Sequence, residues 1–242
     1  MEALKDRIAI VTGASSGIGL GIARELANEG AIVILAARRA ERLKGIVTEM
    51  VSEGRTAFAV PADLAREEDV LALFSETERL AGPPDILVNN AGIADDTPVE
   101  DLSLERWREV LDINLTAAFL CSREAFRRMK AKGGGRIFNI GSLSAKIPRP
   151  HSIAYNASKF AIEGLTRSLA LDGRDHNITA TVIHPGQTIS SLVPGVTDQL
   201  SENAIQPSVL GRFVVLMASL PPDIAVLDTT ILPVKVPFLG RG

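Results

Sequence analysis

The chain has 242 residues, of which 46% are hydrophobic and 23% charged, and its formal net charge is −3. Acidic and basic residues are interspersed, so no basic face for nucleic acid is expected, and no apolar stretch reaches the roughly 18 residues of a membrane helix. The single cysteine, Cys121, excludes an internal disulfide, and its helical surroundings favour a packed side chain. We therefore expect a cytoplasmic protein without a signal peptide.

Short apolar runs recur along the chain, and helical patterns separate them. The runs predict strands at 7–12, 31–37, 56–60, 85–89, 136–142, 178–184 and 227–233. The patterns predict helices at 17–29, 40–53, 66–81, 103–130, 153–173 and 207–219. Strands that are apolar throughout are typical of a parallel sheet covered on both faces. We predict an α/β fold, in which residues 1–242 form a single domain with one doubly wound, Rossmann-type parallel sheet of about seven strands.

Glycine-containing or polar segments directly follow five of these predicted strands. The turn 13–19 follows the first strand, Asp63 the third, and Asn89-Asn90-Ala91-Gly92 the fourth, while Ser142 ends the fifth and Pro185-Gly186 follows the sixth. Because the carboxyl ends of parallel strands meet at one edge of the sheet, we expect these groups to line a single site.

The turn after the first strand has the composition of a dinucleotide-binding loop. It reads Thr12-Gly13-Ala14-Ser15-Ser16-Gly17-Ile18-Gly19 and leads into a predicted helix. Glycines let the backbone come close to a pyrophosphate, and the helix N-terminus offers N–H groups and its positive dipole end. The spacing fits the generic Gly-x-Gly-x-x-Gly fingerprint only approximately, so an ordinary strand–turn–helix is the alternative.

The only tyrosine, Tyr155, lies four residues before Lys159 and thirteen after Ser142. Residues four apart project from the same face of a helix, so the ammonium can favour the ionised phenol. A hydroxyl from elsewhere in the fold could hold a substrate oxygen against this phenol. The set has the parts of a proton-transfer device, although a Tyr–Lys pair alone is also explained by an aromatic ring packed under a lysine stem.

Together these motifs resemble the short-chain dehydrogenase/reductase family, in order and in spacing. The resemblance implies an NAD(P)H-dependent oxidoreductase that interconverts a ketone or aldehyde and an alcohol by hydride transfer. It also implies the catalytic set Asn114, Ser142, Tyr155 and Lys159. Tyr155 would be the general acid/base and Ser142 would bind the substrate oxygen. Asn114 would mark a helix kink that holds a water, with an ordinary polar helix position as the alternative.

The family pattern further implies which residues contact the cofactor. They are Gly13, Ser15, Ser16, Gly17, Ile18, Gly19, Arg38, Asp63, Leu64, Asn90, Ala91, Gly92, Tyr155, Lys159, Pro185, Gly186, Thr188 and Ser190. Ala37 stands where NAD enzymes of this kind usually carry a carboxylate, and the guanidinium of Arg38 is suited to a 2′-phosphate. NADP(H) is therefore favoured and NAD(H) is the alternative. Asp63 is alternatively the N-cap of the next helix.

We expect the substrate to be a small carbonyl compound or alcohol. Its pocket is expected from Ser144, Gln187, Leu192 and Val193, with a substrate loop at about 187–206. No metal site is expected. Arg149 and His151 could read a carboxylate, but we favour a surface-loop interpretation, and His184 is interpreted as a structural residue at a strand end. Three departures from the family pattern stand out. Ser190 stands where a threonine commonly meets the pyrophosphate side of the cofactor. Gly141 occupies a position where relatives often have serine, and the C-terminus lacks the acidic-Gly-Gly ending of many relatives.

The sequence is also compatible with two other functions. The basic run Arg123, Arg127, Arg128, Lys130 and Lys132 would suit a ketoreductase acting on carrier- or CoA-bound 3-oxoacyl thioesters. A non-catalytic NADP-binding regulatory protein is the less favoured possibility. The predicted helices 103–130 and 153–173 have apolar residues on more than one face, so a homodimer or homotetramer is expected.

Overall fold

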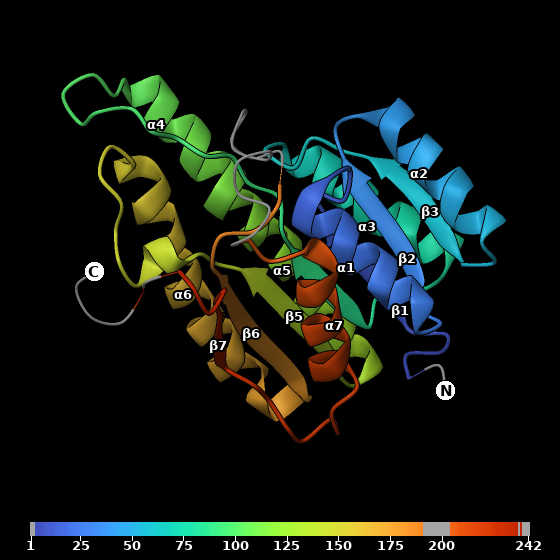
Figure 1. Ribbon diagram of the computed structural model, residues 1–242. Coiled ribbons are helices and arrows are strands. Elements are labelled where there is room, and N and C mark those ends of the chain that lie inside the picture. The colour runs from blue at the N-terminus through green and yellow to red at the C-terminus, as the bar shows by residue number, and fades with distance from the viewer. Residues whose placement is uncertain (1–2, 191–203, 237, 239–242) are drawn as a thin grey trace.

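The computed structural model describes residues 3–190, 204–236 and 238. Its parallel sheet has seven strands in the order β3-β2-β1-β4-β5-β6-β7 (Figure 1). The strands are β1 Ile8–Thr12, β2 Ile32–Ala37, β3 Ala57–Pro61, β4 Ile86–Asn89, β5 Gly135–Ile140, β6 Ile178–Pro185 and β7 Asp228–Ile231. The predicted fold class is confirmed, and the strand order reverses between β1 and β4, where ligands bind in open sheets of this kind.

Helices cover both faces of the sheet. They are α1 Gly17–Asn28, α2 Ala40–Ser52, α3 Glu67–Leu80, α4 Leu104–Leu111, α5 Ala117–Lys132, α6 Ile153–Gly173 and α7 Pro207–Ala218. The first two and α7 lie on one face, and α3, α5 and α6 lie on the other (Figure 1). In the described parts of the chain, no helix combines the length and the hydropathy needed to cross a membrane.

The predicted helix 103–130 is not continuous. A five-residue π-helix, Asp112–Thr116, separates α4 from α5. A π-helical turn contains one extra residue, which widens the helix, and such turns are frequent at functional sites. The departure from a regular helix is therefore centred on Asn114.

Strand residues supply apolar side chains to both faces of the sheet in alternation. In β1, Val11 belongs to the hydrophobic cluster that includes Leu26 of α1, whereas Ile10 belongs to the cluster on the opposite face with Phe74 of α3. All four side chains are inaccessible to solvent. This double burial explains why the strands read as continuous apolar runs.

The only cysteine lies in the second of these clusters. Cys121 is fully buried, and this burial raises the pKa of its thiol to about 12. The nucleophilic thiolate is therefore scarce near neutral pH. The predicted packed side chain is confirmed.

Two glycines allow α1 and α7 to approach closely. A Cβ atom on Gly21 would lie 2.5 Å from Cβ of Pro207, the first residue of α7. A Cβ atom on Gly211 would lie 2.8 Å from the carbonyl oxygen of Gly21. This close packing fixes the position of α1, whose first turn faces the carboxyl edge of the sheet.

We expect Gly21→Ala to destabilise the protein by roughly 1–3 kcal/mol, because the added methyl group has to displace α7. The matched control is Gly45→Ala in the middle of α2, where an added Cβ meets no atom within 4 Å. That substitution should stabilise the protein by about 0.5–1 kcal/mol, since alanine is the better helix former. Urea unfolding followed by circular dichroism compares them, and equal effects would contradict the close packing.

Candidate active site

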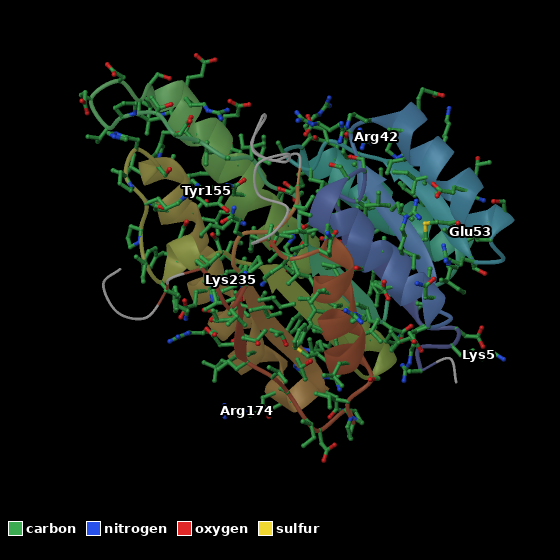
Figure 2. The ribbon with its side chains drawn as sticks, viewed as in Figure 1. Lys5, Arg42, Glu53, Tyr155, Arg174 and Lys235 are labelled. Atoms are coloured by element: carbon green, nitrogen blue, oxygen red, sulfur yellow. The ribbon has the colours of Figure 1, made fainter. Side chains whose placement is uncertain are left out.

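Tyr155 and Lys159 lie one turn apart on α6, and both side chains are buried. The Nζ atom of Lys159 donates a 2.9 Å hydrogen bond to the carbonyl oxygen of Ile140, the last residue of β5. The same atom lies 5.5 Å from the centroid of the Tyr155 ring. Figure 2 shows Tyr155 near the upper end of α6. The two side chains thus meet as their spacing predicts, and the lysine ties them to the carboxyl edge of the sheet.

Asn114 is buried and links the loop after β4 to helix α6. Its Oδ1 atom accepts a 2.7 Å hydrogen bond from the N–H of Ile93, and its Nδ2 atom donates 3.0 Å to the carbonyl oxygen of the same residue. Nδ2 also lies 3.1 Å from Oγ of Ser158, which itself donates to the carbonyl oxygen of Tyr155. An ordinary polar helix position does not describe this residue, because its amide joins the loop after β4 to the turn that carries Tyr155.

Ser142 lies just beyond the sheet. The prediction that it ends the fifth strand is wrong by two residues, because β5 ends at Ile140 and a short 3-10 helix begins at Leu143. Its Oγ atom accepts a 3.1 Å hydrogen bond from the N–H of Ser144, whose side chain is buried. The hydroxyl is thereby oriented while its own proton remains available to another acceptor.

The glycine turn between β1 and α1 is tied to the segment after β4. The Thr12 hydroxyl accepts hydrogen bonds from the N–H groups of Asn90 and Ala91, at 2.9 and 3.1 Å. The Asn90 amide in turn donates 3.0 Å to the carbonyl oxygen of Thr12. Gly13 and Gly17 both have positive φ angles, 63° and 53°. At Gly13 an added Cβ would also lie 2.8 Å from the Asn90 amide nitrogen. Both the backbone angle and the lack of space therefore require glycine at this position.

The two arginines after β2 take different positions. Arg39 donates from Nη2 to the hydroxyls of Ser15 and Ser16, at 2.9 and 3.3 Å, which places its guanidinium on the glycine turn. Arg38, which the sequence favoured as the phosphate clamp, lines a cavity of about 480 Å³ together with Asp63. No local sequence pattern indicates the contact between Arg39 and these two serines, which lie 24 and 23 positions earlier in the chain.

Asp63 and the buried Leu64 lie at the same edge of the sheet, after β3. The N-cap interpretation of Asp63 is wrong, because Arg66 is the N-cap of α3. The Asp63 carboxylate instead accepts from the N–H of Ala65 at 3.3 Å, and its own N–H donates to Asp69 at 2.9 Å. These bonds hold the loop beside Arg38.

The segment after β6 is anchored before it enters the predicted substrate loop. Gly186 donates to the carbonyl oxygen of Ile231 at 2.7 Å, and the Thr188 hydroxyl donates to the carbonyl oxygen of Gly186 at 2.9 Å. Gln187 accepts a backbone hydrogen bond from Ile205, which closes the base of the loop. Ser190 is the last described residue before the gap, and the predicted pocket residues Leu192 and Val193 lie outside the described residues.

His184 explains the unusual glycine at position 141. A Cβ on Gly141 would lie 2.6 Å from Nδ1 of His184, so a serine there would collide with the imidazole. The same Nδ1 lies 2.9 Å from the carbonyl oxygen of Ser142 and 3.3 Å from its nitrogen. His184 is therefore a structural residue at the end of β6, as interpreted from the sequence, and its ring holds the backbone of Ser142 in position.

Acidic groups surround the other side of this imidazole. His184 Nε2 lies 3.4 Å from Asp228 and 3.7 Å from Glu163, a set of metal-ligating types. The Lys146 ammonium bonds both carboxylates, at 2.8 and 3.1 Å, and the bond to Asp228 contributes most to raising the pKa of that lysine. The lysine therefore already serves as the cation of this cluster.

Comparison with known proteins now decides the family. The sequence model of the short chain dehydrogenase family matches residues 7–201. This chain belongs to the short chain dehydrogenases. It is accordingly an oxidoreductase that uses NAD(P)H to interconvert carbonyl and alcohol groups, and the resemblance found in the motifs is confirmed.

Two relatives illustrate the range of the family. Dehydrogenase/reductase SDR family member 11 of Gallus gallus is 32% identical over 252 residues, covering 97% of this chain and 99% of the relative. A 3-oxoacyl-[acyl-carrier-protein] reductase of Staphylococcus aureus is 34% identical over 206 residues, covering 85% of this chain and 84% of the relative.

Solved structures share the fold over almost the entire chain. A dehydrogenase/reductase from Sinorhizobium meliloti superimposes with a TM-score of 0.85 at 35% identity, covering 95% of each chain. An alcohol dehydrogenase from the archaeon Thermococcus sibiricus, complexed with 5-hydroxy-NADP, gives a TM-score of 0.87 at 26% identity, covering 96% of this chain and 98% of that one.

We expect Thr12→Val to lower the free energy of unfolding of this short chain dehydrogenase by about 1–3 kcal/mol, because two backbone N–H groups lose their buried acceptor. The valine preserves the shape of the side chain. Thr48→Val is the control, since that hydroxyl bonds only a helix carbonyl on the exposed surface, and it should change stability by about 0.5 kcal/mol or less. Urea midpoints measure both, and similar shifts would contradict the role of Thr12.

Proposed function

We propose that this enzyme is an NADP(H)-preferring reductase of small ketones or aldehydes, which also oxidises the corresponding alcohols, and that residues 1–242 act as one catalytic domain. The observation that carries the proposal is Lys159, which bonds the last residue of β5 beside the Tyr155 ring. Ser142 follows that strand by two residues, and Asn114 is bonded to the same turn of α6. When bound, the nicotinamide cofactor supplies or accepts the hydride.

The proton is handled by Tyr155. In reduction the phenol gives its proton to the carbonyl oxygen, and in oxidation it takes the proton from the alcohol. Ser142 donates its hydroxyl proton to the same oxygen, since the bond from Ser144 already satisfies one of its lone pairs. Lys159 uses one N–H for Ile140 and keeps two for the phenol and the cofactor ribose.

The cofactor is held along the carboxyl edge of β1 to β4. Helix α1 begins at Gly17, so the N–H groups of its first turn suit a pyrophosphate. Ala37 carries no charge that would repel a 2′-phosphate, and two guanidinium groups follow it. We assign Arg39 to this phosphate beside Arg38, because Arg39 already lies against the glycine turn.

Titration with NADPH and with NADH, followed by nicotinamide fluorescence, is expected to show tighter binding of NADPH. A charge-assisted bond to the phosphate contributes about 1.5–3 kcal/mol, which corresponds to roughly a tenfold to hundredfold change in Kd. Arg39→Ala and Arg38→Ala, tested separately, should weaken NADPH binding and leave NADH binding nearly unchanged. Tighter binding of NADH by the wild type would overturn the cofactor preference and leave the enzyme class intact.

Tyr155→Phe should lower kcat by about 10²- to 10⁴-fold, because the general acid is lost. The Kd for the cofactor should stay within a few-fold of the wild type, which shows that the site is still folded. Steady-state reduction of a neutral ketone measures kcat, and fluorescence titration measures the Kd for the cofactor. Unchanged kcat would remove Tyr155 from the mechanism.

A 3-oxoacyl thioester reductase is the second candidate, supported by the Staphylococcus aureus relative. The basic run on α5 argues against docking of an acidic carrier there. Arg123, Arg127 and Arg128 all pair with Glu124, and Lys132 pairs with Asp85. Arg123 also pairs with Glu67 and Arg128 with Glu78, so most of the positive charge of these four residues has an acidic partner within the chain.

Self-association is expected, because α5 and α6 leave large apolar side chains exposed. Phe119 is 46% exposed, Phe160 47% and Leu171 62%. A second copy of the chain would cover such groups. Sedimentation should therefore show a dimer or tetramer, and only a 25.8 kDa species would contradict this expectation. The cytoplasmic location also stays a prediction.

A further inference from the structure

The loop between β5 and α6 presents one arginine in a fixed position. Arg149 stands between Pro148 and Pro150, which restrict the backbone on either side. The amide of Asn156 donates a 2.9 Å hydrogen bond to the carbonyl oxygen of Arg149 and accepts one of 3.4 Å from its N–H. One side chain of α6 therefore holds both backbone groups of this arginine.

The guanidinium of Arg149 lies over the ring of Tyr155. Its Cζ atom is 5.5 Å from the ring centroid, within the range of a cation–π contact. Because Asn156 directly follows Tyr155 in the chain, the residue that anchors Arg149 and the ring it covers belong to the same turn of α6. The position of Arg149 next to the phenol is therefore fixed by α6 itself.

Arg149 has no anionic partner among the described residues. Exposed arginines such as Arg127 and Arg167 pair with a glutamate on their own helix. Across residues 3–190, 204–236 and 238, no carboxylate lies within 4.0 Å of the Arg149 guanidinium. Lys159 is the other cation beside the ring, but it is buried and bonded to Ile140. In the described part of the chain, Arg149 is therefore the exposed cation beside the Tyr155 ring, and its guanidinium has no hydrogen-bond or ion-pair partner there.

We propose that Arg149 binds a carboxylate of the substrate, so that the enzyme acts on oxo acids and the corresponding hydroxy acids. A guanidinium presents paired N–H groups that match the two oxygens of a carboxylate. The inference rests on the proposed function, in which the substrate carbonyl lies against the Tyr155 hydroxyl. A molecule with a carbonyl and a carboxylate a few bonds apart would then bridge Tyr155 and Arg149.

This inference revises the surface-loop interpretation of Arg149. The sequence shows an exposed loop with two prolines, and nothing local indicates that Asn156 clamps it. If the guanidinium only stabilised the ring of Tyr155, acidic and neutral substrates would respond equally to its removal. A change in the preference for an acid over its ester therefore indicates a contact with the substrate, whereas an equal loss for both indicates a structural role.

The experiment compares three oxo acids with their methyl esters, at saturating NADPH and again at saturating NADH. The pairs are 3-oxobutanoate, 4-oxopentanoate and 4-oxocyclohexanecarboxylate, each with its ester. The measured quantity is the ratio of kcat/KM for the acid to kcat/KM for the ester. Within a pair the carbon skeleton of the oxo acyl group and the reacting ketone are the same, so the ratio isolates the carboxylate.

Arg149→Gln should lower this ratio by about tenfold to hundredfold for at least one pair, the equivalent of one charge-assisted contact. The effect should fall on KM for the acid, with the ester nearly unaffected. Arg149→Lys keeps the charge but loses the paired geometry and should give an intermediate ratio. Asn156→Ala should also give an intermediate ratio. This variant keeps the Arg149 side chain but removes the two hydrogen bonds that hold the Arg149 backbone.

Arg174→Gln is the matched control, since it removes the same charge at the far end of α6 from Tyr155 (Figure 2). Its ratio should equal that of the wild type. A ratio unchanged by Arg149→Gln in every pair, with the ketone still reduced, overturns the carboxylate contact and leaves the proposed function standing. If the wild type reduces none of the six compounds with either cofactor, the proposed function fails, and the inference fails with it.

Discussion

The buried polar groups at the carboxyl edge of the parallel sheet are the constraint on which this site depends. Parallel strands bring several chain ends together at this edge, and the backbone groups there need partners once the helices exclude water. Thr12 satisfies the N–H groups after β4, Lys159 the last carbonyl of β5, and Asn114 the loop at Ile93. Each supplies a bond that would otherwise be missing, at a cost of about 1–3 kcal/mol per buried group.

Two of these side chains, Lys159 and Asn114, also belong to the proposed catalytic set. Lys159 is anchored to Ile140 and still lies beside the Tyr155 ring. Asn114 holds Ile93 and reaches the turn of Tyr155 through Ser158. Because one atom of each group is committed to the fold, its remaining atoms are oriented before any substrate arrives. Such preorganisation contributes to catalysis, since the groups need not reorganise during the reaction.

Gly141 and His184 fit together in this chain. Gly141 leaves room for the imidazole of His184, and that ring braces the backbone of Ser142. Around it, Lys146 joins Glu163 of α6 to Asp228 of β7. Strand β7 is thereby linked to the serine loop and to α6.

The sequence by itself determined the strands, most helices and the motifs at their ends, because apolar periodicity and glycine placement are local properties of the chain. Tertiary structure decided the rest. The π-helix around Asn114 depends on a bond to Ile93, 21 residues away. Arg39 reaches a turn 24 residues earlier, and Arg149 owes its place over Tyr155 to the clamp by Asn156. No local pattern encodes these contacts, because each exists only after the helices have packed on the sheet.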